Sequence, residues 1–210
     1  MNDLLKNIEN QLMMDEERQA YHAKIKGESY MRWLAFYYLG RREHSQKELR
    51  EKLLAKDCDS EAVEALLIEF ANEGYQSDER MTSALIKDSI GKKHGTIRIF
   101  QTLKKHGLTT ISSASQINTW IADHNDFFND LILNDIEENF QDDDNDVGNN
   151  DYEVDWLAQA VEARVRKYGD SIPTDPKEKA RQLRFLQYRG FAMNICFDAL
   201  KYDLTTVHES

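Results

Sequence analysis

A run of carboxylates in the middle of the sequence has the spacing of a metal-binding loop. Asp142, Asp144, Asp146 and Glu153 stand at positions 1, 3, 5 and 12 of an EF-hand-like calcium loop, and Ca2+ prefers oxygen ligands of this kind. The sixth position, where the sharp turn of such a loop requires glycine, is Val147. We therefore interpret the run as a solvated acidic linker, and we expect neither a metal ion nor a cofactor.

The nucleophilic and titratable side chains form no catalytic pattern. The sequence has no glycine-rich phosphate loop, no His-Glu-x-x-His and no Gly-x-Ser-x-Gly. His44 and His94 stand in corresponding linkers between predicted helices, so a structural or partner-facing role is favoured. Cys58 and Cys196 lie far apart without ligand spacing, and we expect Cys58 to be a buried, inert thiol in a reducing, cytoplasmic protein. We expect no catalytic residues and no enzyme activity.

The charge is distributed unevenly along the chain. The formal net charge is -11, yet residues 106–163 hold 14 acidic residues and no lysine or arginine, so the remainder of the chain is slightly basic. Basic clusters outside this segment can meet an anionic partner, or they can be ordinary solvated helix faces. The longest apolar run, residues 33–39, is too short to span a bilayer, so we expect no membrane association.

Helical spacing recurs throughout the elements that must position these charges. The only prolines are Pro173 and Pro176, which favours an all-helical protein. Ser45 and Glu48 form a capping box at the start of a predicted helix over 45–56, and another follows over 60–72. With an aromatic-rich helix over 30–39, these helices predict a three-helix bundle, because none of them can bury its apolar face alone.

The same outline returns fifty residues later and once more near the C-terminus. In the second copy Met81, His94, Ile99, Leu103 and Leu108 match the residues of the first copy, Met31, His44, Leu49, Leu53 and Cys58. In the third copy Asp175 caps a helix, Pro176 occupies its first turn and Gly190 ends it. Leu186 and Phe191 then correspond to Leu53 and Cys58. We expect Leu53, Leu103 and Leu186 to lie in the bundle cores.

Five stretches resemble one known family. They are a basic pair with its capping box over 41–53, the Glu-Gly-Tyr of 73–75, the Ser-Asp-Glu-Arg of 77–80, and the segments 94–107 and 181–191. Their order and spacing are similar to those of the RecX family of recombinase regulators. The resemblance implies an all-α fold of three tandem three-helix repeats in an elongated, curved arrangement. It also implies a protein that docks in the helical groove of RecA–single-stranded-DNA filaments and limits strand exchange, ATP hydrolysis and the SOS response.

On this basis we expect five segments. They are an N-terminal helical extension (1–27), repeat 1 (28–76), repeat 2 (77–120), a partly disordered acidic insertion (121–154) and repeat 3 (155–210). The expected partners are the RecA filament and single-stranded DNA, bound by a monomer. The alternative is a helical module that acts directly on DNA. The candidate partner-binding residues are the basic residues of the repeats: Arg41, Arg42, Arg50, Lys92, Lys93, Arg98, Lys104, Lys105, Arg181, Arg184 and Arg189. We expect the linker charges among them, at 41, 42, 92 and 93, to be exposed and to contribute little to folding.

Two segments depart from the family pattern. The N-terminal extension carries Leu4, Leu5, Ile8 and Leu12 on one helical face, which fits either a further helix packed on repeat 1 or a mobile arm. In the acidic insertion we predict one extra helix over 121–140 and an unstructured stretch over 142–155. The insertion could repel phosphate, fold back over basic repeats as a DNA mimic, or serve only as a spacer.

Overall fold

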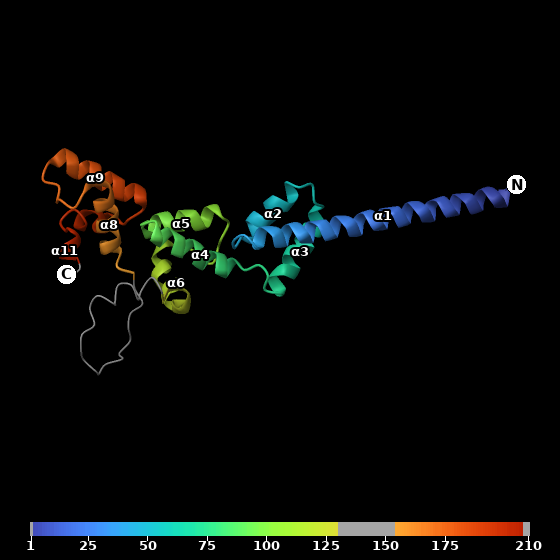
Figure 1. Ribbon diagram of the computed structural model, residues 1–210, viewed down its shortest axis with the longest axis horizontal. Helices are drawn as coiled ribbons and strands as arrows, with labels where there is room; N and C mark the ends of the chain where they lie inside the picture. Colours follow the sequence, from blue (N-terminus) through green and yellow to red (C-terminus); the bar gives the residue numbers. More distant parts are fainter. Residues whose placement is uncertain (1, 130–153, 208–210) are drawn as a thin grey trace, which may run out of the picture. The chain divides into compact units, whose positions relative to one another are not determined.

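Every regular element in the described part of the chain is a helix. The computed structural model describes residues 2–129 and 154–207, and it divides the chain into two compact units, Met1–Ser77 and Asp78–Ser210 (Figure 1). Among the described helices none is both long enough and apolar enough to cross a membrane. The predicted all-helical class is confirmed for these residues.

The first unit is a three-helix repeat. It consists of α1 (Asn2–Leu39), α2 (Gln46–Leu54) and α3 (Ser60–Asn72), each of which contacts the other two. Their apolar residues recur at three- and four-residue spacing, so one face of each helix turns inward. The side chains of Ala35, Leu49, Leu53, Val63 and Phe70 are completely buried in the resulting core.

The N-terminal extension continues the first helix of this repeat. Backbone hydrogen bonding runs without interruption from Asn2 to Leu39, and Figure 1 shows the N-terminal half of α1 projecting past α2 and α3. The structure therefore has one long helix in place of the two alternatives that the sequence left open. The apolar stripe from Leu4 to Leu12 belongs to residues whose side chains lie outside the description.

The second unit begins with the helices of the second repeat. These are α4 (Asp78–Gly91), α5 (Thr96–Lys105), a short 3-10 turn η1 (Ala114–Gln116) and α6 (Ile117–Asp123). The prediction of one helix over 121–140 was wrong at its start. α6 begins four residues earlier because Ile117 and Ile121 are both completely buried, then a turn at His124 separates α6 from a new helical stretch at 125–129. The remainder of that predicted helix, and the calcium-like loop from Asp142 to Glu153, lie outside the described residues.

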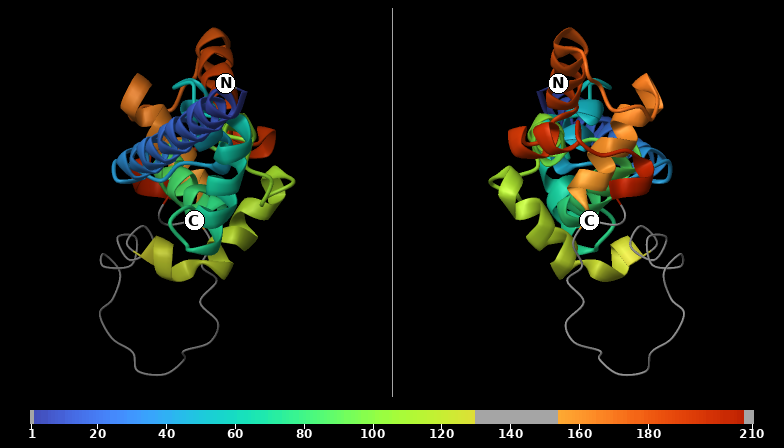
Figure 2. Two further views of the ribbon diagram at one scale, coloured as in Figure 1. Left: turned by 90° about the vertical axis from the view of Figure 1, so that its right-hand side faces the viewer. Right: turned by 90° about the vertical axis from the view of Figure 1, so that its left-hand side faces the viewer.

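The third repeat completes the second unit. It consists of α8 (Trp156–Tyr168), α9 (Pro176–Arg189), α10 (Met193–Asp198) and α11 (Leu204–Val207), and α9, α10 and α11 all contact α8 (Figure 1, Figure 2). The predicted cap of α9 is confirmed, since the Asp175 carboxylate accepts from the N–H groups of Lys177 and Glu178, both at 3.0 Å. Asp155, expected in the unstructured stretch, instead caps α8 through the N–H groups of Leu157 and Ala158.

A buried arginine ties this repeat together. The Arg164 side chain on α8 has no exposed surface. Its two terminal nitrogens donate to the carbonyl oxygens of Ser171, at 3.0 Å, and Tyr202, at 2.8 Å. Burial lowers the pKa of Arg164, and the nearby carboxylates of Asp170 and Asp203 act in the opposite direction. Nothing in the sequence predicts this burial, because an arginine on a helix ordinarily faces water.

The repeat alignment is visible in the backbone where α2, α5 and α9 end. Asp57, Gly107 and Gly190 follow these helices and have positive φ angles of 57°, 75° and 86°. In each copy the N–H of the next residue donates to the carbonyl five residues before it, at 3.4, 3.1 and 3.2 Å respectively. This is the Schellman closure of a helix. Leu53, Leu103 and Leu186 are each at most 1% exposed, so their predicted core positions are confirmed.

Candidate functional site

The second and third repeats meet where the start of α5 lies against the end of α9. The N–H groups of Gly95 and Ile97 donate to the carbonyls of Arg189 and Gly190, both at 3.0 Å. A Cβ on Gly95 would overlap the Gly190 carbonyl, and a Cβ on Gly190 would overlap the backbone of Arg98. Two glycines are therefore required here. The positive N-terminus of one helix dipole faces the negative C-terminus of the other, which is a favourable arrangement.

This junction gathers three of the predicted basic residues. The Arg189 side chain donates to the carbonyl of Lys92 at 2.7 Å, and the Arg98 guanidinium lies 5.4 Å from the centre of the Tyr188 ring. His94 lies among them. Burial lowers the pKa of His94, and the positive charges of Arg189, Arg98 and Lys92 lower it further. Lys92 also forms an ion pair of 2.6 Å with Asp88, so Arg98 on α5 and Arg189 on α9 supply most of the positive charge at this junction.

The positive region continues along α9 toward the end of α8. The Phe185 ring lies under both Arg189, at 5.2 Å, and Lys167, at 4.2 Å. The Tyr168 ring packs edge-on against Phe185 at 5.5 Å and carries Arg181 at 5.3 Å. Cation–π contacts hold these side chains in place and keep their charge available. We call this set the basic–aromatic surface: Lys92, Arg98, Lys167, Tyr168, Arg181, Phe185, Tyr188 and Arg189.

Four members of this surface were not predicted from the sequence, and one of them is Tyr188, the ring under Arg98. Lys167 and Tyr168 end α8, and Phe185 lies four residues after Arg181 on α9. Alternating cations and aromatic residues at helical spacing were the available signal. That signal gains meaning only when α8 and α9 are known to be neighbours. Arg184 is exposed on α9 and donates to the Ala180 carbonyl at 3.1 Å, so it lies on the same helix without joining a ring contact that the structure records.

The predicted basic residues of the first unit behave differently. Arg42 forms two hydrogen bonds of 3.0 Å with the Glu48 carboxylate. Arg50 forms a two-point contact with Glu64 at 2.5 and 2.9 Å. Each pair largely neutralises its own charge. Arg41 instead lies over the Tyr37 ring at 4.6 Å.

The remaining predicted residues of the second unit lie apart from the basic–aromatic surface. Lys104 and Lys105 end α5, at the opposite end from Arg98, and Lys104 lies 4.6 Å from the Phe100 ring. Lys93 forms an ion pair of 2.7 Å with Glu162 on α8, and only 14% of its side chain is exposed. The expectation that Lys93 is an exposed linker charge was wrong. Lys93 has a positive φ of 57°, and its side chain is covered because it pairs with Glu162 on α8.

The first histidine of the pair is structural. His44 is only 3% exposed, its Nδ1 lies 3.0 Å from the Arg42 carbonyl, and its own carbonyl accepts from Gln76 at 3.2 Å. Burial is the main cause that lowers the pKa of His44. The imidazole is therefore held neutral in the linker between α1 and α2.

The two thiols are held in the protonated form. Burial raises the pKa of the Cys196 thiol to about 11. Cys58 is half-buried, whereas full burial was expected. Burial, and to a smaller extent the negative charge of Asp57, raises the pKa of the Cys58 thiol as well. Because the thiolate is the nucleophile, both environments disfavour covalent chemistry.

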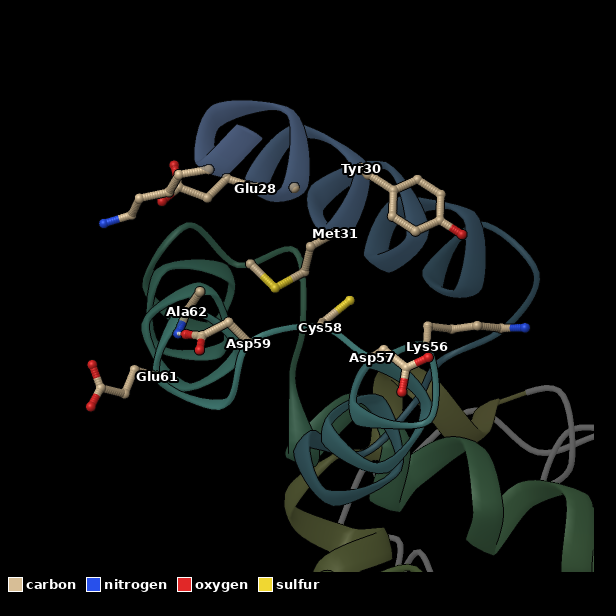
Figure 3. A pocket seen from close by; sticks show the side chains of 11 residues that line it. Glu28, Tyr30, Met31, Lys56, Asp57, Cys58, Asp59, Glu61 and Ala62 are labelled. Carbon is tan, nitrogen blue, oxygen red and sulfur yellow. Dashed lines mark hydrogen bonds between the residues drawn. The ribbon is translucent and has the colours of Figure 1, made fainter. Parts of the chain in front are cut away.

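A pocket in the first unit separates α1 from the turn between α2 and α3. Its volume is about 580 Å3, and Figure 3 shows the sulfur atoms of Met31 and Cys58 facing its centre. Asp59 and Glu61 border it on one side, and Lys56 lies on the other (Figure 3). Among the residues that the structure describes, no three His, Cys, Asp or Glu side chains come together in a way that could hold a metal ion.

These features define a class, a tandem three-helix repeat protein with a basic face, and the comparisons with known proteins identify the family. Residues 34–69 match the model of the first three-helix domain of RecX, and residues 153–200 match that of the third. The chain is 34% identical over 188 residues to the regulatory protein RecX of Acinetobacter baylyi, covering 90% of this chain and 96% of the relative. It is 31% identical over 157 residues to that of Halorhodospira halophila, covering 75% and 78%.

Solved structures agree on the fold. The crystal structure of RecX from Lactobacillus salivarius gives a TM-score of 0.53 at 13% identity, covering 84% of this chain and 96% of that one. A second crystal structure of a regulatory protein RecX gives 0.55 at 15% identity, covering 86% and 74%. The chain belongs to the RecX family of regulatory proteins. The resemblance identified from the motifs is thereby confirmed.

Proposed function

We propose that this chain binds RecA–DNA filaments in their helical groove and inhibits the recombinase, ATPase and SOS-inducing activities of the filament. Membership of the RecX family supports the regulatory role, and the finer statement follows from what that family resemblance implies. We further propose that the chain acts as a cytoplasmic monomer and works by binding, with no catalytic step. The raised thiol pKa values and the buried, neutral His44 are consistent with this.

The observation that carries the proposal is the convergence of cations on the basic–aromatic surface. Arg189 lies almost a hundred residues after Lys92 and Arg98 in the sequence, and the hydrogen bond from its side chain to the Lys92 backbone carbonyl brings Arg189 to the start of α5. A filament presents phosphates along an extended path, and such a path is recognised by charge spread over several elements. The same surface suits acidic side chains of the recombinase.

A charge-removal experiment tests this surface. Replacing both Arg181 and Arg184 with serine removes two exposed charges from α9, and we expect weaker inhibition of recombinase ATP hydrolysis. The matched control replaces Arg166 and Lys201, which form exposed ion pairs outside the surface, and it should inhibit like the parent. Co-sedimentation with RecA–DNA filaments, with bare single-stranded DNA in parallel, separates filament binding from DNA binding. Full inhibition by a folded Arg181→Ser/Arg184→Ser variant would remove α9 from the interface.

A further inference from the structure

Three aromatic side chains form a stacked row on the exposed face of α1. Tyr30, Trp33 and Tyr37 follow one another at three- and four-residue spacing, so they lie on one side of the helix. Consecutive ring centres are 6.1 and 5.5 Å apart, and each pair of ring planes is inclined by only 18°. The residues are 50%, 58% and 42% exposed respectively. We call this set the aromatic row.

Folding of the first unit does not account for the aromatic row. α1 contributes Met31, Leu34 and Ala35 to the core, each at most 5% exposed, and these residues lie on a different side of the helix. Three large rings left in water at adjacent positions gain little from the hydrophobic effect. A contiguous exposed apolar patch of this kind ordinarily marks an interaction surface.

Cations lie beside the Tyr37 end of the aromatic row. The Arg41 guanidinium lies 4.6 Å from the centre of the Tyr37 ring. Lys52 on α2 lies 4.8 Å from the Tyr38 ring, which itself packs edge-on against Tyr37 at 5.7 Å.

We propose that the aromatic row is a binding surface for single-stranded nucleic acid, on which unpaired bases stack while these cations contact the phosphates. Centre separations of 5.5 to 6.1 Å between nearly parallel rings indicate offset stacking, which leaves part of each ring face uncovered. From residue 30 to residue 37 the helix rises by about 10 Å, which matches two or three bases stacked at about 3.4 Å. Aromatic rings beside cations are the common construction of single-strand binding surfaces.

The occupant follows from the combination of ring and charge. A purely apolar protein helix would use the rings and leave the cations unmatched, whereas a duplex would offer phosphates and keep its base faces covered. Among nucleic acids, only an unpaired strand presents both open base faces and phosphates. The surface requires no recombinase, so this inference goes beyond the proposed function and does not depend on it.

Trp33 provides a direct spectroscopic readout. The chain has three tryptophans. Trp120 donates to the Ser83 hydroxyl at 3.0 Å, and Trp156 is 8% exposed and donates to Asn118 at 2.8 Å. Trp33 is the tryptophan most exposed to an added ligand, so a base that stacks on it should quench its fluorescence.

The test is a titration of the full chain with a thirty-nucleotide oligothymidylate at low salt and without recombinase. The comparison ligand is an abasic strand with the same number of phosphates. We expect oligothymidylate to quench tryptophan fluorescence and to bind at least about tenfold more tightly than the abasic strand, because each stacked base contributes to affinity. Equal affinities for the two strands, or binding without quenching, would overturn the proposal.

Two variants locate the effect. Trp33→Leu keeps an apolar, helix-favouring side chain and removes the ring, so it should lose the preference for bases over abasic phosphate and retain its thermal stability. Phe197→Leu is the matched control, because Phe197 is also 51% exposed but lies on α10 in the other unit, and it should bind like the parent. A retained base preference in Trp33→Leu would overturn the assignment, as would protein self-association through this face in analytical ultracentrifugation.

The same variants keep the two proposals apart. Recombinase inhibition is measured in parallel for each of them. Base-dependent binding that Trp33→Leu abolishes supports the aromatic row, whatever happens to inhibition. Loss of inhibition in the Arg181→Ser/Arg184→Ser variant bears on the α9 face of the proposed recombinase interface and not on the aromatic row.

Discussion

Helices α2 and α5 begin at corresponding positions of two repeats, yet their first turns are satisfied in different ways. In the first unit Ser45 accepts from the Glu48 N–H at 3.1 Å, and the Glu48 carboxylate accepts from the Ser45 N–H at 3.4 Å. In the second unit Gly95 has no side chain to offer, and the N–H groups at the start of α5 donate instead to the carbonyls of Arg189 and Gly190.

The difference shows how one repeat unit can serve two purposes. A serine makes the start of α2 self-sufficient, because its cap is local in sequence. A glycine makes the start of α5 dependent on another repeat, because the missing Cβ allows a backbone to approach. The second arrangement also draws Lys92, Arg98 and Arg189 together around His94. In this protein the contact that packs the second repeat against the third also brings residues of the basic–aromatic surface together.

The largest expected effect on stability concerns the buried leucine that the repeats share at an equivalent position. Leu53→Ala in the first unit and Leu186→Ala in the second should each lower the free energy of unfolding by about 2–5 kcal/mol, since both side chains are completely buried. Urea unfolding followed by far-ultraviolet circular dichroism measures the change. Ile68→Ala, at a side chain 59% exposed on α3, is the control and should cost little. Costs below about 0.5 kcal/mol at both leucines would contradict the repeat alignment.

A smaller loss of stability is expected from substitutions at the N-cap positions of α2 and α5, and its consequence for filament binding should differ between the two helices. Gly95→Ala places a Cβ against the Gly190 carbonyl, and we expect a loss of about 1–3 kcal/mol with reduced filament binding. Ser45→Ala removes only the local cap, at a cost of about 1 kcal/mol, and should leave filament binding intact. Unfolding and filament co-sedimentation of both variants make the comparison. If Gly95→Ala were as stable and active as the parent, the close approach of α5 and α9 would be unnecessary.

The smallest effect concerns the two corresponding histidines. Burial lowers the pKa of both below the ordinary 6.5, and only His94 is lowered further by Arg189, Arg98 and Lys92. Arg189→Gln should therefore raise the pKa of His94 and leave that of His44 unchanged, as measured by NMR titration of the imidazole protons. A shift of both histidines, or of neither, would show that the charges do not converge on His94.

The depressed pKa values also set the direction of a pH effect. A histidine whose folded pKa is lowered binds its proton first in the unfolded chain. Its contribution to stability is therefore complete above pH 6.5 and declines as the pH falls from there toward the folded pKa. Thermal melts at pH 7.5 and 5.5 should show the parent losing more stability than a His44→Asn variant that still folds.

Much of the fold was predictable because its signals are local. The capping box at Ser45, the cap and stop of α9 at Asp175 and Gly190, and the spacing of buried leucines all depend on residues within a few positions of one another. Helix ends and amphipathic faces are decided at that range. The fifty-residue repeat could be recognised because each copy carries the same local spacing. The repeat predicted the common core position of Leu53, Leu103 and Leu186.

The candidate site was predictable only as a list of charges. Eleven basic residues satisfied the pattern equally well, and the structure separates them by partners that are distant in sequence. Arg50 pairs with Glu64, Lys93 is covered by Glu162, and Arg189 reaches Lys92. The sequence carried no sign of which of these charges would be neutralised.

The sequence by itself thus determined the all-helical class, the caps at Ser45 and Asp175, the repeat and the family, because these depend on short-range spacing and on motif order. The tertiary structure alone decided which cations share a surface, why Gly95 and Gly190 must lack side chains, and why Arg164 is buried. The physical reason is that electrostatic neutralisation, close backbone approach and burial depend on distances in space, which chain separation does not specify when helices from different repeats pack together.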